Sequence, residues 1–177
     1  DVLDVHAQRI GAVNCVTVKR KTSGSNTDWV GYINSLKKEK IDKKKTILIL
    51  GFGGASQAIY YGLTIKGFKN IVVFNRSRKI INIRNIKKYT KKYPLINNYL
   101  TNAGLIINTT PTNPLNKKQI NLIKEDTIIS DIVYKPKNTA FMNQFKNNRK
   151  IFGISMLIEQ ALPCFYKWFG FVPEVDK

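Results

Sequence analysis

The stretch ILILGFGGASQAIYYGLTIKGFKNIVVFNRSRK, residues 47–79, joins two apolar runs through a glycine-rich turn and a helix-like segment. It begins with a buried strand over 46–50 that runs into a glycine-rich turn, and a helix follows to about Lys66. A second apolar strand over 70–74 comes next. A strand, a helix and a second strand of these lengths predict one βαβ unit of a parallel sheet.

The turn GFGGAS carries most of a nucleotide-binding fingerprint. Gly51 and Gly53 hold the first two places of Gly-x-Gly-x-x-Gly, and the small Ser56 holds the third. Because the turn follows a strand and opens a helix, we expect a dinucleotide's pyrophosphate at the helix start, against the backbone of Gly51, Gly53, Gly54 and Ala55. The alternative reading is a glycine turn that holds no ligand.

The end of the second strand indicates which dinucleotide would bind. An NAD site usually carries Asp or Glu there, whereas an Arg accommodates a 2′-phosphate. This chain has Asn75, Arg76, Ser77, Arg78 and Lys79, with no acid among them. Arg76 can offer paired hydrogen bonds to a phosphate, so we expect NADP. The alternative is that basic residues stand here by chance in a Lys-rich chain.

The rest of the chain continues the alternation of strands and helices. A strand over 13–20 leads through a connector to a helix that starts at Thr27 or Asp28. The later elements expected are helices over 78–93, 117–124, 138–148 and 155–169, and strands over 103–111, 127–134 and 150–153. This order predicts an α/β fold, a Rossmann-like, doubly wound, mostly parallel sheet with helices on both faces.

Composition excludes several classes of protein. The net charge is +19, yet the lysines stand in short scattered clusters, so we do not expect nucleic acid as the main partner. Cys15 and Cys164 are far apart without other ligands nearby, so we expect neither a metal site nor a redox pair. The start lacks a signal-peptide pattern, and the apolar stretch 151–173 is interrupted by charged residues. We expect a cytoplasmic protein without a membrane span.

Seven blocks in order resemble the shikimate dehydrogenase family and cover nearly the whole chain. They are GAVNC (11–15), GSNTDWVGYINSL (24–36), GFGGAS (51–56), NRS (75–77), INTTP (107–111), DIVYKP (131–136) and GISMLIEQA (153–161). The resemblance implies NADP-dependent, reversible reduction of 3-dehydroshikimate to shikimate, a step of the chorismate pathway of aromatic amino-acid biosynthesis.

The resemblance also assigns residues to roles. Asp28 is the expected catalytic residue, which contacts the substrate and pairs with a catalytic Lys in the family. Asn14, Tyr134 and Gln160 are expected to contact the substrate with it. The expected cofactor contacts are Gly51, Gly53, Gly54, Ala55, Asn75, Arg76, Ser77, Thr109, Gly153 and Met156. Simpler readings remain for three residues: Asp28 as a helix N-cap, Asn14 as a turn residue and Gln160 as a surface residue.

The sequence also departs from the family. Cys15, Gln57, Asn113 and Ser155 replace residues that are common there. Only ten residues stand before Gly11, so we expect the Ser-x-Ser pair and the catalytic Lys of the amino-terminal lobe to be missing. Lys19 and Lys21 do not stand in a similar segment.

Two functions follow from this departure. One is a shikimate dehydrogenase part that needs a partner or a longer chain to supply the lobe, and the other is an inactive NADP-binding domain. A third alternative is another NADP oxidoreductase with a similar nucleotide domain, such as a glutamyl-tRNA reductase. The blocks GAVN (11–14) and NTD (26–28) argue against it. We divide the chain into a lobe remnant and hinge (1–27), an NADP-binding domain (28–153) and a helix returning to the cleft (154–177). We also expect self-association through exposed apolar surface.

Overall fold

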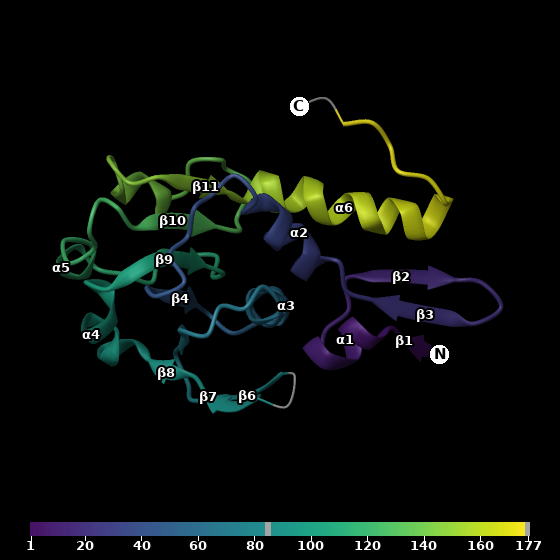
Figure 1. Cartoon of the computed structure of the whole chain (residues 1–177), viewed down its shortest axis with the longest axis horizontal. Helices are drawn as coiled ribbons and strands as arrows, with labels where there is room; N and C mark the ends of the chain where they lie inside the picture. The colour runs from purple at the N-terminus through teal and green to yellow at the C-terminus, as the bar shows by residue number, and fades with distance from the viewer. Residues whose placement is uncertain (84–85, 176–177) are drawn as a thin grey trace.

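The computed structural model describes residues 1–83 and 86–175, and its centre is a six-stranded sheet in which every neighbouring pair is parallel (Figure 1). In spatial order the strands are β11 (Lys150–Phe152), β10 (Ile128–Asp131), β9 (Ala103–Asn108), β4 (Thr46–Leu50), β5 (Ile71–Asn75) and β8 (Lys91–Lys92). Chain order reverses between β4 and β9, and the carboxyl ends of the strands on either side of that point form a natural ligand crevice.

Helices cover both faces of this sheet, as predicted. One face packs on α2 (Asp28–Ser35) and α3 (Gly54–Ile65), and the other on the short helices α4 (Asn97–Leu100), η1 (Tyr93–Leu95) and η2 (Met142–Gln144). Side chains of β4 alternate between the two cores, with Ile47 and Ile49 on the α2–α3 side and Leu48 and Leu50 on the other. The Rossmann-like fold class is therefore confirmed.

The first 25 residues form a separate small sheet. Its strands are β1 (Val2–Leu3), β3 (Thr22–Ser25) and β2 (Cys15–Val18), with α1 (Val5–Ile10) beside them. The strand expected over 13–20 is present but shorter, and the expected connector is strand β3, paired antiparallel to β2. Gly24 permits this packing, because a Cβ there would lie 2.8 Å from Leu3 Cδ2.

The helix predicted over 78–93 is wrong. In its place lies an antiparallel hairpin of β6 (Ile80–Ile83) and β7 (Ile86–Tyr89), followed by β8, while residues 84–85 lie outside the described part. Ile81 and Ile83 are buried and Ile80 is exposed, which is the period of a strand. Charges obscured this period, and the β-branched isoleucines favour strand over helix.

Two further helices are shorter than predicted. Only α5 (Lys117–Ile120) forms within 117–124, and only the single turn η2 forms within 138–148. Thr139 fixes that turn by donating to Asp131 Oδ2 at 2.6 Å and accepting from the Met142 amide at 3.1 Å. Phe141 and Phe145 are buried and pack this segment against the sheet.

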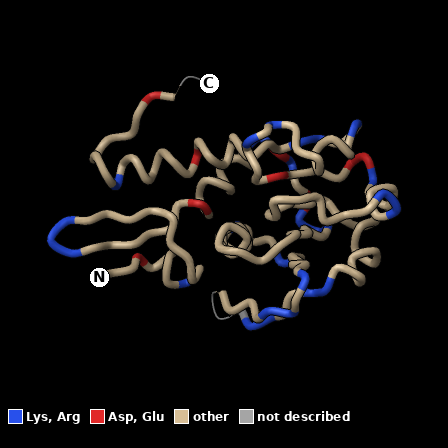
Figure 2. Tube along the Cα trace, turned by 180° about the vertical axis from the view of Figure 1, so that it is seen from behind, with Lys and Arg blue, Asp and Glu red and all other residues tan. Residues whose placement is uncertain are grey.

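The long last helix, α6 (Gly153–Phe169), begins at β11 and extends past the sheet to the small amino-terminal sheet (Figure 1). Within residues 1–83 and 86–175, no helix is both long and apolar enough to cross a membrane. Lys and Arg positions are distributed over several separate places, including the tip of the β2–β3 hairpin and the β6–β8 region (Figure 2).

Candidate active site

The glycine turn between β4 and α3 has the geometry of a phosphate site. Gly51 has φ +100°, and a Cβ there would lie 2.6 Å from Thr109 Oγ1, so a side chain fits neither the backbone nor the space. A Cβ at Gly53 would meet no described residue within 4 Å, which leaves the start of α3 open to a ligand. The buried Ser56 stabilises the turn by donating a hydrogen bond to the Gly51 carbonyl at 2.9 Å.

A cavity of about 580 Å³ adjoins this turn at the carboxyl ends of β4, β5 and β9. Its lining residues are Gly51, Phe52, Gly53, Asn75, Arg76, Tyr93, Thr109, Thr110, Pro111, Thr112 and Pro114. Among the described residues, this lining contains an arginine, several hydroxyls and a helix start, but no acid. A phosphorylated nucleotide fits this chemistry, because anions bind at helix starts and at guanidinium groups.

The basic loop after β5 is held in place by its neighbours. Asn75 Nδ2 donates to the Ser77 carbonyl at 3.0 Å. Thr90, buried between β7 and β8, accepts from the Lys79 amide at 2.8 Å and donates to the Ser77 carbonyl at 3.2 Å. The hairpin that sequence reasoning missed therefore supports the loop, while exposed Arg76 has no ion-pair partner among the described residues.

Tyr93 is a lining residue that the sequence analysis missed. It follows β8 directly, and its buried Oη has no hydrogen-bond partner within residues 1–83 and 86–175. Burial raises the pKa of Tyr93 to about 12, although the nearby Arg76 charge and Gly51 backbone oppose the rise. Its position at the carboxyl end of an outer strand was the available signal, and the incorrect helix prediction concealed it.

A second cavity of about 330 Å³ lies on the other side of the glycine turn. Its lining residues are Asn14, Asp28, Ala55, Ile132, Tyr134, Gly153, Met156, Leu157 and Gln160. The structure thus brings together all four residues predicted to contact substrate, with Gly153 and Met156 beside them. Gly153 lies so close to the Ile132 carbonyl that a Cβ would collide with it. No lysine lines this cavity in the described part of the chain.

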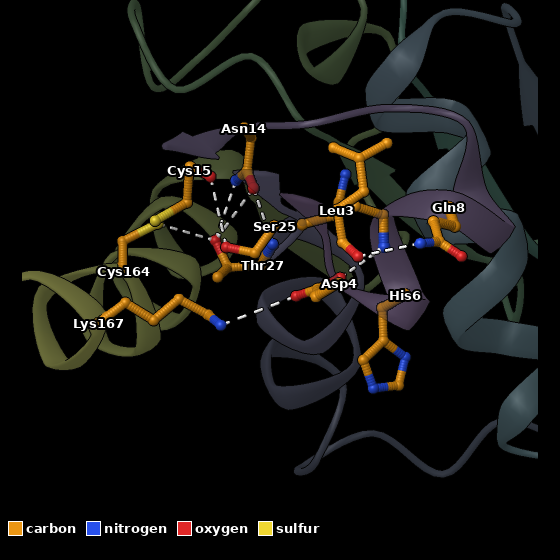
Figure 3. Close-up of polar contacts among 12 residues, drawn as sticks. Leu3, Asp4, His6, Gln8, Asn14, Cys15, Ser25, Thr27, Cys164 and Lys167 are labelled. Carbon is orange, nitrogen blue, oxygen red and sulfur yellow. Dashed lines mark hydrogen bonds and ion pairs between the residues drawn. The ribbon is translucent and has the colours of Figure 1, made fainter. Parts of the chain in front are cut away.

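Asn14 organises the polar side of the second cavity. Its Nδ2 donates to Asp28 Oδ1 at 2.8 Å and lies 2.9 Å from Thr27 Oγ1 and 3.1 Å from Gln160 Oε1. Its Oδ1 accepts from the Thr27 amide at 2.7 Å. The contacts of Asn14 with Thr27, and of Thr27 with Cys164 Sγ at 3.1 Å, are drawn in Figure 3. The Asn14 side chain, just before β2, therefore contacts both the start of α2 and Gln160 on α6.

Asp28 is not the N-cap of its helix. Thr27 is the N-cap, and Asn26 before it accepts at Oδ1 from the amides of Asp28 and Trp29 at 3.1 and 3.4 Å. The Asp28 carboxylate instead faces Asn14 in the cavity. Burial raises the pKa of Asp28, and the hydrogen bond from Asn14 opposes the rise. A partly desolvated carboxyl group in a cavity is typical of acid–base sites.

Gln160 reaches this network because α2 and α6 pack closely. A Cβ on Gly31 would lie 2.5 Å from Gln160 Cβ, so only glycine allows the two helices this contact. Met156, Gln160 and Cys164 recur every four residues and lie on one face of α6. Sequence reasoning missed Gly31, whose place inside the helix was the one available signal.

The two cysteines lie next to this polar network, with Cys164 in contact with Thr27. Cys15 on β2 and Cys164 on α6 are both buried and free (Figure 3). Burial raises the pKa of the Cys164 thiol to about 11. Within the described residues, no cluster of three His, Cys, Asp or Glu side chains has the arrangement of a metal site.

Comparisons with known proteins agree with this geometry. A scan against protein-family models gives no match. The chain is 37% identical to the shikimate dehydrogenase (NADP(+)) of Dictyoglomus thermophilum, covering 97% of this chain and 67% of the relative. It is 34% identical to that of Geobacillus sp., covering 100% of this chain and 70% of the relative.

Solved structures show the same likeness. Shikimate 5-dehydrogenase of Thermus thermophilus, in complex with NADP(H) and shikimate, superposes with a TM-score of 0.80 at 30% identity, covering 98% of this chain and 68% of that one. The Aquifex aeolicus enzyme gives a TM-score of 0.82 at 29% identity, covering 98% and 67%. The chain thus spans about two thirds of its relatives, and it belongs to the shikimate dehydrogenase family.

Proposed function

We propose that this chain carries the NADP site and much of the substrate site of an enzyme that reversibly reduces 3-dehydroshikimate to shikimate with NADPH. The observation that carries the proposal is the pair of cavities on either side of the glycine turn. One is lined by the helix start and Arg76, and the other by Asn14, Asp28 and Gln160. The relatives that the chain matches are named shikimate dehydrogenase (NADP(+)), which supports both the cofactor site and the substrate site of the proposal.

The proposed cofactor contacts follow the lining of the first cavity. The turn Gly51–Ala55 would hold the pyrophosphate against the start of α3. Asn75, Arg76 and Ser77 would hold the 2′-phosphate, since the loop has cations and no carboxylate to repel it. Thr109 packs on the turn by donating to the Leu50 carbonyl at 2.7 Å. The bound cofactor supplies the hydride for the ketone carbon.

The proposed substrate contacts are the polar groups of the second cavity. Asn14, Gln160 and Tyr134 carry amide and phenol groups that suit a polyhydroxylated ring. Asp28 would exchange the proton of the reacting oxygen or hold the group that does so, because Asn14 fixes its carboxylate inside the cavity. Gly153 and Met156 complete the wall toward the nicotinamide end.

A second candidate function is NADP binding without turnover by this chain alone. The observation that favours it is the lining of the substrate cavity, which includes no lysine among the described residues. Under this candidate the chain is an inactive NADP-binding domain. The proposed division into 1–27, 28–153 and 154–177 belongs to both candidates, and the last two residues lie outside the described part.

The test is NADPH formation from shikimate and NADP at alkaline pH by the purified chain, with quinate as a second substrate. NADPH binding is followed in the same preparation. Turnover that is lost in Asp28→Asn supports the enzyme, and binding without turnover supports the second candidate. A chain that neither binds NADPH nor turns over would contradict both.

A further inference from the structure

Tyr93 stands where the outer strands of the sheet meet the cofactor cavity. It follows β8, whose residues Lys91 and Lys92 pair in parallel with Phe74 and Asn75 of β5. Its ring packs on Phe74, with ring centroids 6.3 Å apart. The side chain is therefore fixed from behind, and it forms part of the cavity wall beside Arg76 and Gly51.

The hydroxyl of Tyr93 is buried and has no hydrogen-bond partner among the described residues. The Gly51 backbone lies near this hydroxyl, but the Gly51 amide already donates to the Phe74 carbonyl at 2.7 Å. A buried hydroxyl without a partner is costly, and native proteins contain few of them. Neighbouring polar groups of the basic loop have partners, since Asn75 Nδ2 donates to the Ser77 carbonyl and that carbonyl also accepts from Thr90. Within residues 1–83 and 86–175, Tyr93 Oη has no hydrogen-bond partner, and Arg76 in the same lining has no ion-pair partner.

We propose, on the basis of the proposed function, that Tyr93 Oη donates a hydrogen bond to the 2′-phosphate of NADP beside Arg76. The two groups would then share the phosphate, the guanidinium supplying charge and the phenol a neutral, rigidly held donor. The phenol is protonated at neutral pH, and burial raises its pKa further, to about 12. Tyr93 would accordingly discriminate NADP from NAD without taking part in the chemistry.

The experiment compares two probes that differ only in this phosphate, adenosine 2′,5′-bisphosphate and adenosine 5′-monophosphate. Their dissociation constants are measured by titration calorimetry on the full chain, on Tyr93→Phe and on Tyr99→Phe. Tyr99 is the matched control, since its ring also packs on Phe74, at 5.6 Å, and does not line the cavity. A thermal melt of each variant checks that it is folded.

We expect Tyr93→Phe to bind the bisphosphate about tenfold more weakly, as for loss of a hydrogen bond to a charged group, and the monophosphate unchanged. Tyr99→Phe should match the wild type with both probes. Equal weakening with both probes, or none, would overturn the role of Tyr93 while leaving the proposed cofactor site standing. A wild-type chain that does not prefer the bisphosphate would overturn both proposals.

Discussion

At the scale of the residue, Arg76 carries the expected preference for NADP. It is an exposed cation on a loop without a carboxylate, at the rim of the larger cavity. Arg76→Ala should weaken NADP binding by about 2 kcal/mol, the size of a charge-assisted hydrogen bond, and leave NAD binding nearly unchanged. Binding titrations with both nucleotides measure this, with Arg9→Ala on α1 as the charge-matched control. An unchanged ratio of NADP to NAD affinity would remove Arg76 from the site.

Asp28 makes a prediction about stability as a function of pH. Its pKa is raised by burial in the folded chain, so its contribution to stability is full below its ordinary value of 3.8 and is lost as the pH rises through the folded pKa. In Asp28→Asn the side chain cannot ionise, so the variant does not lose stability in this way as the pH rises. Its free energy of unfolding, measured in urea, should therefore rise relative to wild type between acidic and neutral pH.

Asp126 provides a control of opposite sign. A hydrogen bond from Lys45 lowers the pKa of Asp126, so its contribution appears as the pH rises and is lost on acidification. The free energy of unfolding of Asp126→Asn should therefore fall relative to that of the wild type as the pH rises over the same range. The change should be small because the group is exposed. The same pH trend in both variants would contradict the environment described for Asp28.

At the scale of the element, the close contact of α2 and α6 determines whether Gln160 reaches the substrate cavity. Gly31→Ala would place a methyl group against Gln160, and overpacking of this kind costs about 2 kcal/mol. We expect lower stability, weaker shikimate binding and intact NADPH binding, because the first cavity does not involve this contact. Asn34→Ala on the same helix is the control. If Gly31→Ala kept full shikimate affinity, the helix contact would not position the site.

The β6–β7 hairpin can be tested by the alternation of its isoleucines. Ile81 is 2% exposed and Ile80 is 54% exposed, so the two neighbours point to opposite sides. Ile81→Ala should lower the free energy of unfolding by about 3 kcal/mol, and Ile80→Ala should change it by no more than about 0.5 kcal/mol. Chemical unfolding of the two variants gives the comparison. Equal costs would indicate that the segment is not this strand.

At the scale of the whole molecule, apolar surface is exposed at the end of α6 and on β2. Val18, Trp168, Phe169, Phe171 and Val172 are all about half or more exposed. We expect the chain to self-associate, with an average mass that rises with concentration in sedimentation equilibrium. The double change Phe169→Ser and Phe171→Ser should reduce this association. A wild-type chain that stays monomeric at every concentration would contradict the expectation.

The sequence predicted the parallel sheet because its inner strands are uniformly apolar, as in ILIL before Gly51 and GLIIN before Thr109. It failed where tertiary packing overrides local pattern. Ile81 and Ile83 form a strand among charges that resemble a surface helix, and Thr139 with Phe141 replaces an expected helix by one turn. Of the site, motif residues were predictable, whereas the places of Tyr93 and Gly31 depend on contacts between distant segments.

A calorimetric titration of the full chain, first with NADPH and then with shikimate, tests whether this chain holds both the cofactor site and the substrate site. We predict that one NADPH binds per chain, more tightly than NADH, and that shikimate then binds with an affinity that Asp28→Asn lowers without affecting NADPH. This result does not depend on turnover. A chain that failed to bind NADPH, or bound NADH equally well, would contradict the account of the glycine turn and the Arg76 loop.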